Sequence, residues 1–95
     1  MRVLLTNLPP LLEDILSEAL AGESDMTVVA SSPDVVLTQA SSDEAHDLAR
    51  DVGSVGLVAI DPESRHALVF ARGPDAVLLS DVSPATIIAA IRSMA

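Results

Sequence analysis

The sequence of 95 residues contains no cysteine, so disulfides, thiolate metal sites and cysteine nucleophiles are excluded. It also has no tryptophan, no tyrosine and one phenylalanine, Phe70, so its core must be built mainly from aliphatic side chains and alanine. Apolar residues make up 49% of the chain, which is typical of a folded protein and not of a disordered one. We therefore expect a single domain spanning residues 1–95.

Positive charge is also scarce, because the chain has no lysine and its five arginines are scattered along it. Fourteen acidic residues give a formal charge of -9, an excess that most often serves solubility. A surface that binds nucleic acid needs clustered cations to neutralise phosphates. Nucleic acid is therefore not an expected partner.

Long apolar runs are absent as well. The first apolar run is interrupted by Asn7 and by the prolines at positions 9 and 10, so it predicts neither a signal peptide nor a membrane span. We expect a cytoplasmic protein that does not bind a membrane.

Short β-forming runs alternate with helical patterns along the chain. Strands are predicted at 2–6, 26–30, 34–39, 55–60 and 76–79. Three helices are predicted, beginning at Pro10, after Ser41 and after Ser83. Strands that alternate with helices indicate an α/β fold with a mostly parallel sheet.

The segment at 61–71 has two interpretations. Asp61 and Pro62 can form a turn between two strands, which predicts a β-hairpin at 55–71. The same residues can instead cap a helix that ends at Gly73. We favour the hairpin, because 67–71 is a continuous apolar run without a polar helical face.

Three segments carry a resemblance to a known family. The opening RVLLTNLPPLLEDILSEALAGESDMTVVA resembles the first strand, first helix and second strand of a bacterial response-regulator receiver domain. PDVVLTQ resembles the third strand of that family, and VLLSDVSPATIIAAIR resembles its last strand and helix. The resemblance implies a truncated receiver-like, or flavodoxin-like, sheet and a role in signal transduction.

The residues that perform phosphotransfer in receivers are absent. The acidic pair of the family falls on Asn7 and Leu8, the phosphate-accepting aspartate on Gln39, and the lysine on Ser80. An amide cannot form an acyl phosphate, and leucine cannot bind a metal ion. The resemblance therefore implies a degenerate receiver, a pseudo-receiver that works without phosphorylation.

The expected elements also depart from the receiver plan. Only Ser31, Ser32 and Pro33 separate the runs at 26–30 and 34–39, whereas a parallel crossover takes a dozen or more residues. We expect either that these two strands run antiparallel or that one of them leaves its usual position. A hairpin at 55–71 also removes the fourth helix of the family.

Other chemistry has little support in the sequence. No Gly-x-Ser-x-Gly motif is present, and His46 lies on the polar side of its predicted helix, as a solvated histidine does. His66, Asp61 and Glu63 share one turn, where a metal site is possible in principle but not expected. We predict no enzyme activity and no cofactor.

Two functions remain open at this point. The first is a regulatory domain that binds another protein, or a second copy of itself, without phosphorylation. The second is a domain that senses a small molecule in the former receiver cleft.

The missing helices predict where such a partner binds. One face of the sheet is expected to be covered by an apolar layer of the first and last helices, which consists of Leu12, Ile15, Leu16, Ile87, Ile88 and Ile91. The other face keeps only the helix at 42–52, so its apolar residues are expected to be partly bare. These include Val35 and Leu37, and the candidate interface consists of Leu57, Ala59, Leu68 and Phe70.

Overall fold

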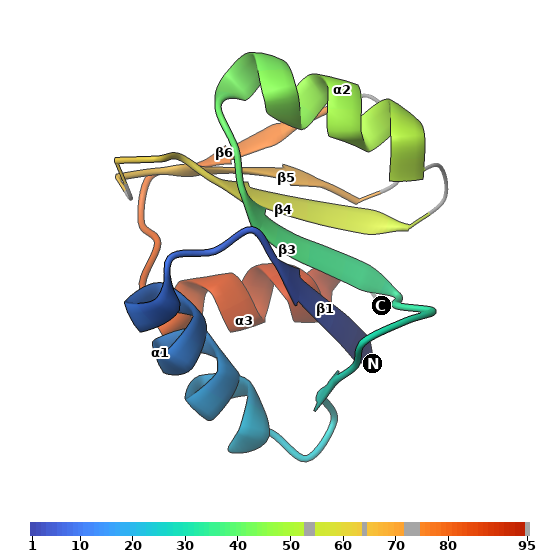
Figure 1. Ribbon diagram of the computed structural model, residues 1–95, viewed down its shortest axis with the longest axis vertical. Helices are drawn as coiled ribbons and strands as arrows, with labels where there is room; N and C mark the ends of the chain where they lie inside the picture. Colours follow the sequence, from blue (N-terminus) through green and yellow to red (C-terminus); the bar gives the residue numbers. More distant parts are fainter. Residues whose placement is uncertain (53–54, 64, 72–74, 95) are drawn as a thin grey trace.

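A computed structural model describes residues 1–52, 55–63, 65–71 and 75–94. In these ranges the chain forms six strands and three helices around one sheet (Figure 1). In chain order they are β1 (Arg2–Thr6), α1 (Pro10–Ala21), β2 (Thr27–Val28), β3 (Val35–Gln39), α2 (Ser42–Val52), β4 (Gly56–Ile60), β5 (Ala67–Phe70), β6 (Val77–Leu79) and α3 (Pro84–Ser93).

The sheet has the order β2-β1-β3-β4-β5-β6. β1 pairs in parallel with both β2 and β3, and β3 pairs in parallel with β4. β5 is antiparallel to both β4 and β6. The α/β class with three helices is thus confirmed, whereas the sheet is mixed and not mostly parallel. The reason is the hairpin strand β5, which reverses the chain direction between β4 and β6.

The strands β2 and β3 correct the expectation for 26–39. Both run parallel to β1, on opposite sides of it, so neither alternative predicted from the short linker holds. Val28 at the end of β2 and Val35 at the start of β3 are both level with Val3, so the link at 29–34 crosses from one side of β1 to the other without returning along it. The backbone N–H groups of Val29 and Asp34 bond to the carbonyls of Val3 and Arg2, and Ser32 takes a positive φ of 52° in the link.

The hairpin predicted at 55–71 is confirmed by the antiparallel pairing of β4 with β5. Asp61 donates its backbone N–H to the carbonyl of His66 at 2.9 Å, which closes the turn. The carboxylate of Asp61 accepts the N–H of Glu63 at 2.7 Å, a local bond typical of aspartate in turns. The run Ala67–Phe70 forms a strand, not a helix, because it pairs with β4 on one side and with β6 on the other.

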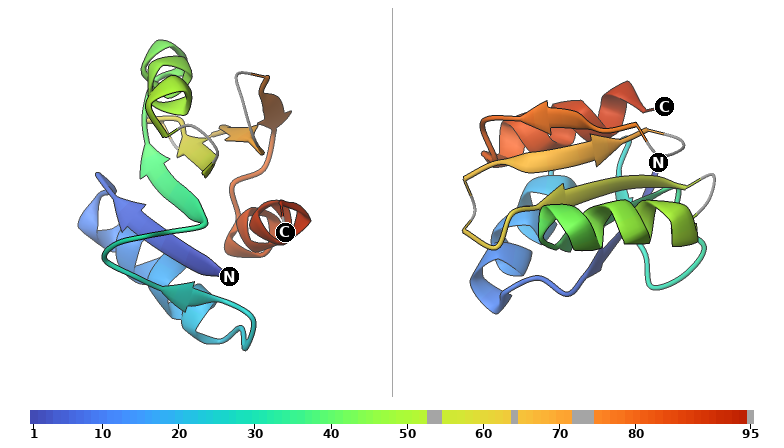
Figure 2. Two further views of the ribbon diagram at one scale, coloured as in Figure 1. Left: turned by 90° about the vertical axis from the view of Figure 1, so that its right-hand side faces the viewer. Right: turned by 90° about the horizontal axis from the view of Figure 1, so that it is seen from above.

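The helices α1 and α3 cover one face of the sheet, and α2 covers the other (Figures 1 and 2). The predicted layer of α1 and α3 is largely confirmed: Leu16, Ile87, Ile88 and Ile91 are buried there, and Leu12 packs against them. The prediction is wrong for Ile15, which is 44% exposed. One residue turns a helix by about 100°, so the neighbour of buried Leu16 points away from the sheet.

The predicted bare face is wrong. Leu57, Ala59 and Phe70 are between 0% and 2% exposed, and Leu68 is half-buried, because all four pack with α2. α2 presents Ala45 and Ala49 to the sheet, and such small side chains let the helix approach closely. Leu57, Ala59 and Phe70 therefore belong to the core, and Leu68 packs against it as a partly buried residue.

Val35 and Leu37 were predicted on the α2 side of the sheet, but they lie on the side of α1 and α3. Both are buried with Leu16 and Ile91 in the core between the sheet and the pair α1 and α3. Val36, the residue between them, packs on the α2 side. Successive strand residues alternate in direction, so a shift of one residue exchanges the two faces.

Candidate functional site

The carboxyl ends of β1 and β3 meet at the point where the strand order reverses, which is where open α/β sheets bind ligands. Asn7 follows β1 and takes a left-handed φ of 52°. Its Nδ2 donates to the backbone carbonyl of Gln39, at the end of β3, at 3.2 Å. Gln39 in turn donates from Nε2 to the carbonyl of Pro62 at 3.4 Å. The amides therefore link the first, third and fourth strands at this edge.

An open cavity of about 290 Å³ lies beside these amides, between the sheet edge and the outer side of α2. It is lined by Asn7, Gln39, Ala40, Glu44, Asp47, Leu48 and Asp51. Glu44 and Ser41 form a capping box at the start of α2, since Glu44 Oε1 accepts the N–H of Ser41 and Ser41 Oγ accepts the N–H of Glu44. Its hydrogen bonds to Ser41 lower the pKa of Glu44, so this wall of the cavity is negatively charged at neutral pH.

The four positions that the resemblance places at the receiver site are only partly brought together. Asn7 and Gln39 are in contact, and Leu8 packs against the core of the α1 face. Ser80 follows β6, which is separated from β3 by β4 and β5. Three strand spacings amount to roughly 14 Å. With β4 and β5 between them, Ser80 lies too far from Gln39 for both side chains to bind one phosphoryl group.

The histidines are both engaged with their neighbours. His46 Nδ1 lies 2.7 Å from the carbonyl of Ser42, and the imidazole meets the ring of Phe70 edge-on at 5.3 Å. His66 Nε2 lies 3.1 Å from Asp61 Oδ2, whereas Glu63 pairs with Arg65. No group of three acidic or histidine side chains within the described ranges could hold a metal ion. His66, Asp61 and Glu63 thus do not converge on one point.

The last strand, β6, lies within the strand predicted at 76–79, but its exposed position at the sheet edge was not predicted. It forms one edge of the sheet and, in the described part of the chain, pairs only with β5. Val77 is 63% exposed and Leu78 is 62% exposed, although both are large apolar residues in a strand. The signal in the sequence was a short apolar run flanked by Asp75 and Asp81, since charged residues commonly border edge strands.

An apolar cavity of about 190 Å³ lies between β6 and the last turns of α3. Its lining consists of Val69, Ala71, Asp75, Val77, Leu79, Ala90, Ser93 and Met94. Sites for drug-sized molecules and cofactors usually measure about 300–1,000 Å³. This cavity therefore suits a single apolar side chain better than a cofactor.

The segment between β6 and α3 is held by a polar cap. Ser83 is the N-cap of α3, and its Oγ accepts the N–H of Thr86 at 3.4 Å. Asp81 Oδ2 accepts the hydroxyls of Thr86 and Ser83 at 2.8 and 3.0 Å. The hydroxyl of Thr86 and the N–H of Ser83 lower the pKa of Asp81, which stays ionised at neutral pH.

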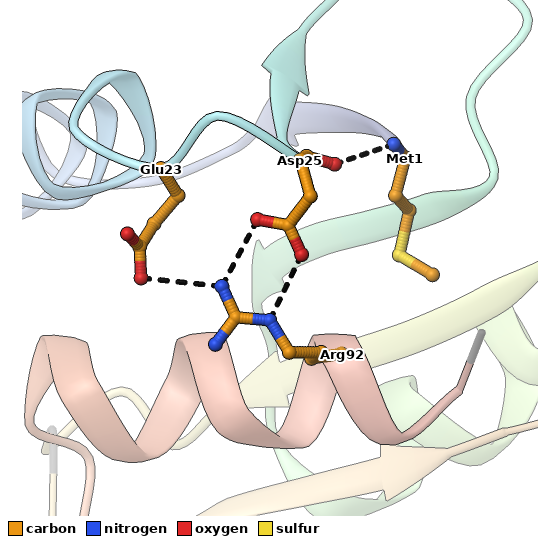
Figure 3. A network of polar contacts seen from close by, with 4 residues as sticks. All are labelled: Met1, Glu23, Asp25 and Arg92. Atoms are coloured by element: carbon orange, nitrogen blue, oxygen red, sulfur yellow. Dashed lines mark hydrogen bonds and ion pairs between the residues drawn. The ribbon is translucent and has the colours of Figure 1, made fainter.

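A second polar cluster joins α3 to the segment between α1 and β2 (Figure 3). Arg92 binds the two oxygens of Asp25 at 2.9 and 3.0 Å and reaches Glu23 at 3.2 Å. The backbone carbonyl of Asp25 accepts the N–H of Met1 at 2.6 Å. These contacts use Nε and Nη2 of Arg92 within the fold, so we interpret the cluster as a clamp between elements.

Comparisons with known proteins add no relative. No family model matches the chain, and no curated protein and no solved structure matches it. Among the helices that the structure describes, none is long and apolar enough to cross a membrane.

Proposed function

We propose that the chain is a non-catalytic regulatory domain that binds another protein without phosphorylation, on a truncated receiver-like fold. The observation that carries the proposal is the edge strand β6. Two large apolar side chains, Val77 and Leu78, are more than 60% exposed there, beside an apolar cavity. Exposed apolar side chains along an unpaired strand edge are typical of a protein-binding surface.

The sheet supports the receiver-like part of the proposal. The order β2-β1-β3-β4, with all of these strands parallel, agrees with the first four strands of the flavodoxin-like order 2-1-3-4-5. α3 follows the last strand and lies beside α1 on one face (Figure 2). The inserted strand β5 takes the place next to β4 and displaces the last strand by one position. A cytoplasmic location stays a prediction.

The residues at the former phosphorylation site support the absence of phosphotransfer. Gln39 offers an amide where an acceptor carboxylate is required, and Ser80 lies across the sheet. We expect no gain of mass when the protein is incubated with acetyl phosphate and Mg²⁺ and its intact mass is measured. A gain of one phosphate group would contradict the proposal.

Binding can be tested at three surfaces with a photo-crosslinking amino acid. We would place p-benzoylphenylalanine at Leu78 on β6, at Leu11 on the outer side of α1, or at Asp47 beside the larger cavity. The expected result in a native extract is a crosslink to one defined protein at one of these positions, equally strong with and without acetyl phosphate. Crosslinks that require acetyl phosphate, or none at any position, would contradict this function.

The larger cavity favours a second candidate function, the sensing of a small molecule. It lies at the strand-order reversal and is lined by the amides of Asn7 and Gln39. A ligand at a hundred times its dissociation constant adds about 2.7 kcal/mol of stability, which a thermal melt detects. A saturable increase in melting temperature that Gln39→Ala removes would favour this function over protein binding.

A further inference from the structure

We propose that β6 binds an extended segment of its partner as a seventh strand, and that this segment carries apolar residues between two basic ones. The inference rests on the proposed function and names the class of partner. Strand addition to an exposed sheet edge is a common mode of peptide recognition, in which main-chain hydrogen bonds supply affinity and side-chain pockets supply specificity.

The hydrogen-bond pattern of the hairpin shows which groups of β6 are free to pair. Asp61 and His66 are bonded across the hairpin, and bonded pairs recur every second residue along antiparallel strands. Leu68 therefore turns its backbone groups toward β4, and Val69 turns its groups toward β6. Val77 is opposite Val69 and faces inward, so its neighbour Leu78 turns its N–H and carbonyl outward.

The side chains of β6 provide contacts on both faces of an added strand. Leu78 is opposite Leu68 and points to the α2 side, where it is 62% exposed. Val77 and Leu79 point to the α3 side and line the apolar cavity of about 190 Å³. A strand beside β6 would project every second side chain toward this cavity. One apolar side chain of the partner is of a suitable size to fill it.

Charge determines which partner fits. Asp75 and Asp81 flank β6, and the whole chain carries a formal charge of -9. A second copy, paired antiparallel about Leu78, would place Asp75 opposite the Asp81 of that copy. Like charges directly opposite each other are destabilising in a sheet. Lysine or arginine at both positions would instead meet a negative charge beyond each end of β6, a charge that Asp81 keeps while its carboxylate caps α3. The surface therefore favours a basic partner over a second copy.

These positions define a probe peptide. Its core is Lys-Thr-Leu-Val-Leu-Thr-Lys, which places a lysine opposite each aspartate, a valine opposite Leu78 and both leucines on the α3 side. The matched control replaces both lysines with glutamate. We expect the lysine peptide to bind about tenfold or more tightly than the glutamate peptide in fluorescence anisotropy. Salt should weaken its binding by screening these exposed charges.

Leu78→Pro tests the main-chain pairing. Proline removes the N–H that faces outward and leaves the bonds to β5 in place, as edge strands permit. Leu78→Thr is the control, because it also removes the leucine side chain but keeps the N–H. We expect the proline variant to lose about tenfold in affinity relative to the threonine variant. Circular dichroism and thermal melts of both variants check that the fold is kept.

Three results would overturn the inference: equal affinity for the lysine and glutamate peptides, equal affinity of the proline and threonine variants, or a wild-type dimer that Leu78→Pro dissociates in sedimentation equilibrium. The proposed function has a separate readout. A partner crosslinked at Leu11 or Asp47, together with no preference for the lysine peptide, would leave the protein-binding function standing and reject β6 as the docking strand.

Discussion

At the scale of single residues, Phe70 is the largest buried side chain, in a chain that has no other phenylalanine, no tyrosine and no tryptophan. It is 1% exposed and packs beneath α2, where its neighbours include Ala45 and Ala49. Small alanine side chains cannot move into the volume of a phenyl ring. Phe70 therefore fills more of the core on this face of the sheet than any other single side chain.

We accordingly expect Phe70→Ala to lower the free energy of unfolding by about 3–5 kcal/mol, because it leaves a cavity that alanines cannot fill. Phe70→Leu keeps most of the apolar volume and should cost less. Urea denaturation of both variants measures the difference. A loss below about 1 kcal/mol for the alanine variant would show that α2 does not cover Phe70.

Arg92 and Asp25 link stability to pH. The side-chain hydrogen bonds from Arg92 lower the pKa of Asp25 below its ordinary value of 3.8 in the folded protein. A carboxyl group with a lowered folded pKa contributes stability that is complete above its ordinary pKa and is lost as the pH falls through the folded value. The clamp should therefore weaken only in acid.

We expect Arg92→Gln to be less stable than the wild type above about pH 5, and the difference to shrink as the pH falls below about 3. Arg50→Gln is the control, because it removes the same charge from an exposed i,i+3 pair with Asp47. Denaturation of the three proteins across this range measures the effect. A stability difference for Arg92→Gln that stays constant with pH would contradict the linkage to Asp25.

At the scale of secondary-structure elements, α1 and α3 differ in how much of their apolar surface they bury. α3 buries Ile87, Ile88 and Ile91 against the sheet. α1 buries Leu16 and Leu20 but leaves Leu11 73% exposed and Ile15 44% exposed. Two isoleucines of the same predicted layer, Ile15 and Ile88, therefore have different environments and form a matched pair.

Truncation of each isoleucine tests this arrangement. We expect Ile88→Ala to cost about 2–5 kcal/mol in unfolding free energy, because Ile88 is 7% exposed. Ile15→Ala should cost clearly less, since its side chain already contacts water. Chemical denaturation gives both values. Equal losses would mean that α1 packs on the sheet in a different rotation.

At the scale of the whole molecule, one sheet crosses the protein, and the strands at its two edges are its shortest. β3 and β4 form the centre and are covered on both faces, whereas β2 has two residues and β6 has three. Backbone groups in the covered centre can exchange only when the fold opens widely. Edge strands open locally.

Hydrogen exchange should therefore be slowest for the amides of β3 and β4, close to the rate of global unfolding. We expect the amide of Leu78 to exchange rapidly, because it faces away from β5, and the amides of β2 to exchange faster than those of β1. Exchange followed by NMR resolves these positions. Protection of Leu78 equal to that of Val58 would show that β6 is not an open edge.

Local signals in the sequence were sufficient for several features of the fold. Helix caps, helical spacing and turn residues predicted all three helices and the hairpin at 55–71, because each of these signals acts within a few residues. The presence of an amide at Gln39, where the resemblance to receivers places the acceptor aspartate, is likewise visible in the sequence alone. An amide at this position cannot accept a phosphoryl group as an acyl phosphate, whatever the fold is.

Long-range packing decided the rest. A strand whose two faces are both covered carries apolar side chains on both faces, so its sequence does not show which residues face which helices. Val35 and Leu37 were therefore assigned to the wrong face of the sheet. The parallel course of β2 depends on its pairing with β1, and the burial of Phe70 depends on how closely α2 approaches. The exposure of β6 follows from its place at the end of the sheet order, because a strand becomes an edge only through that position.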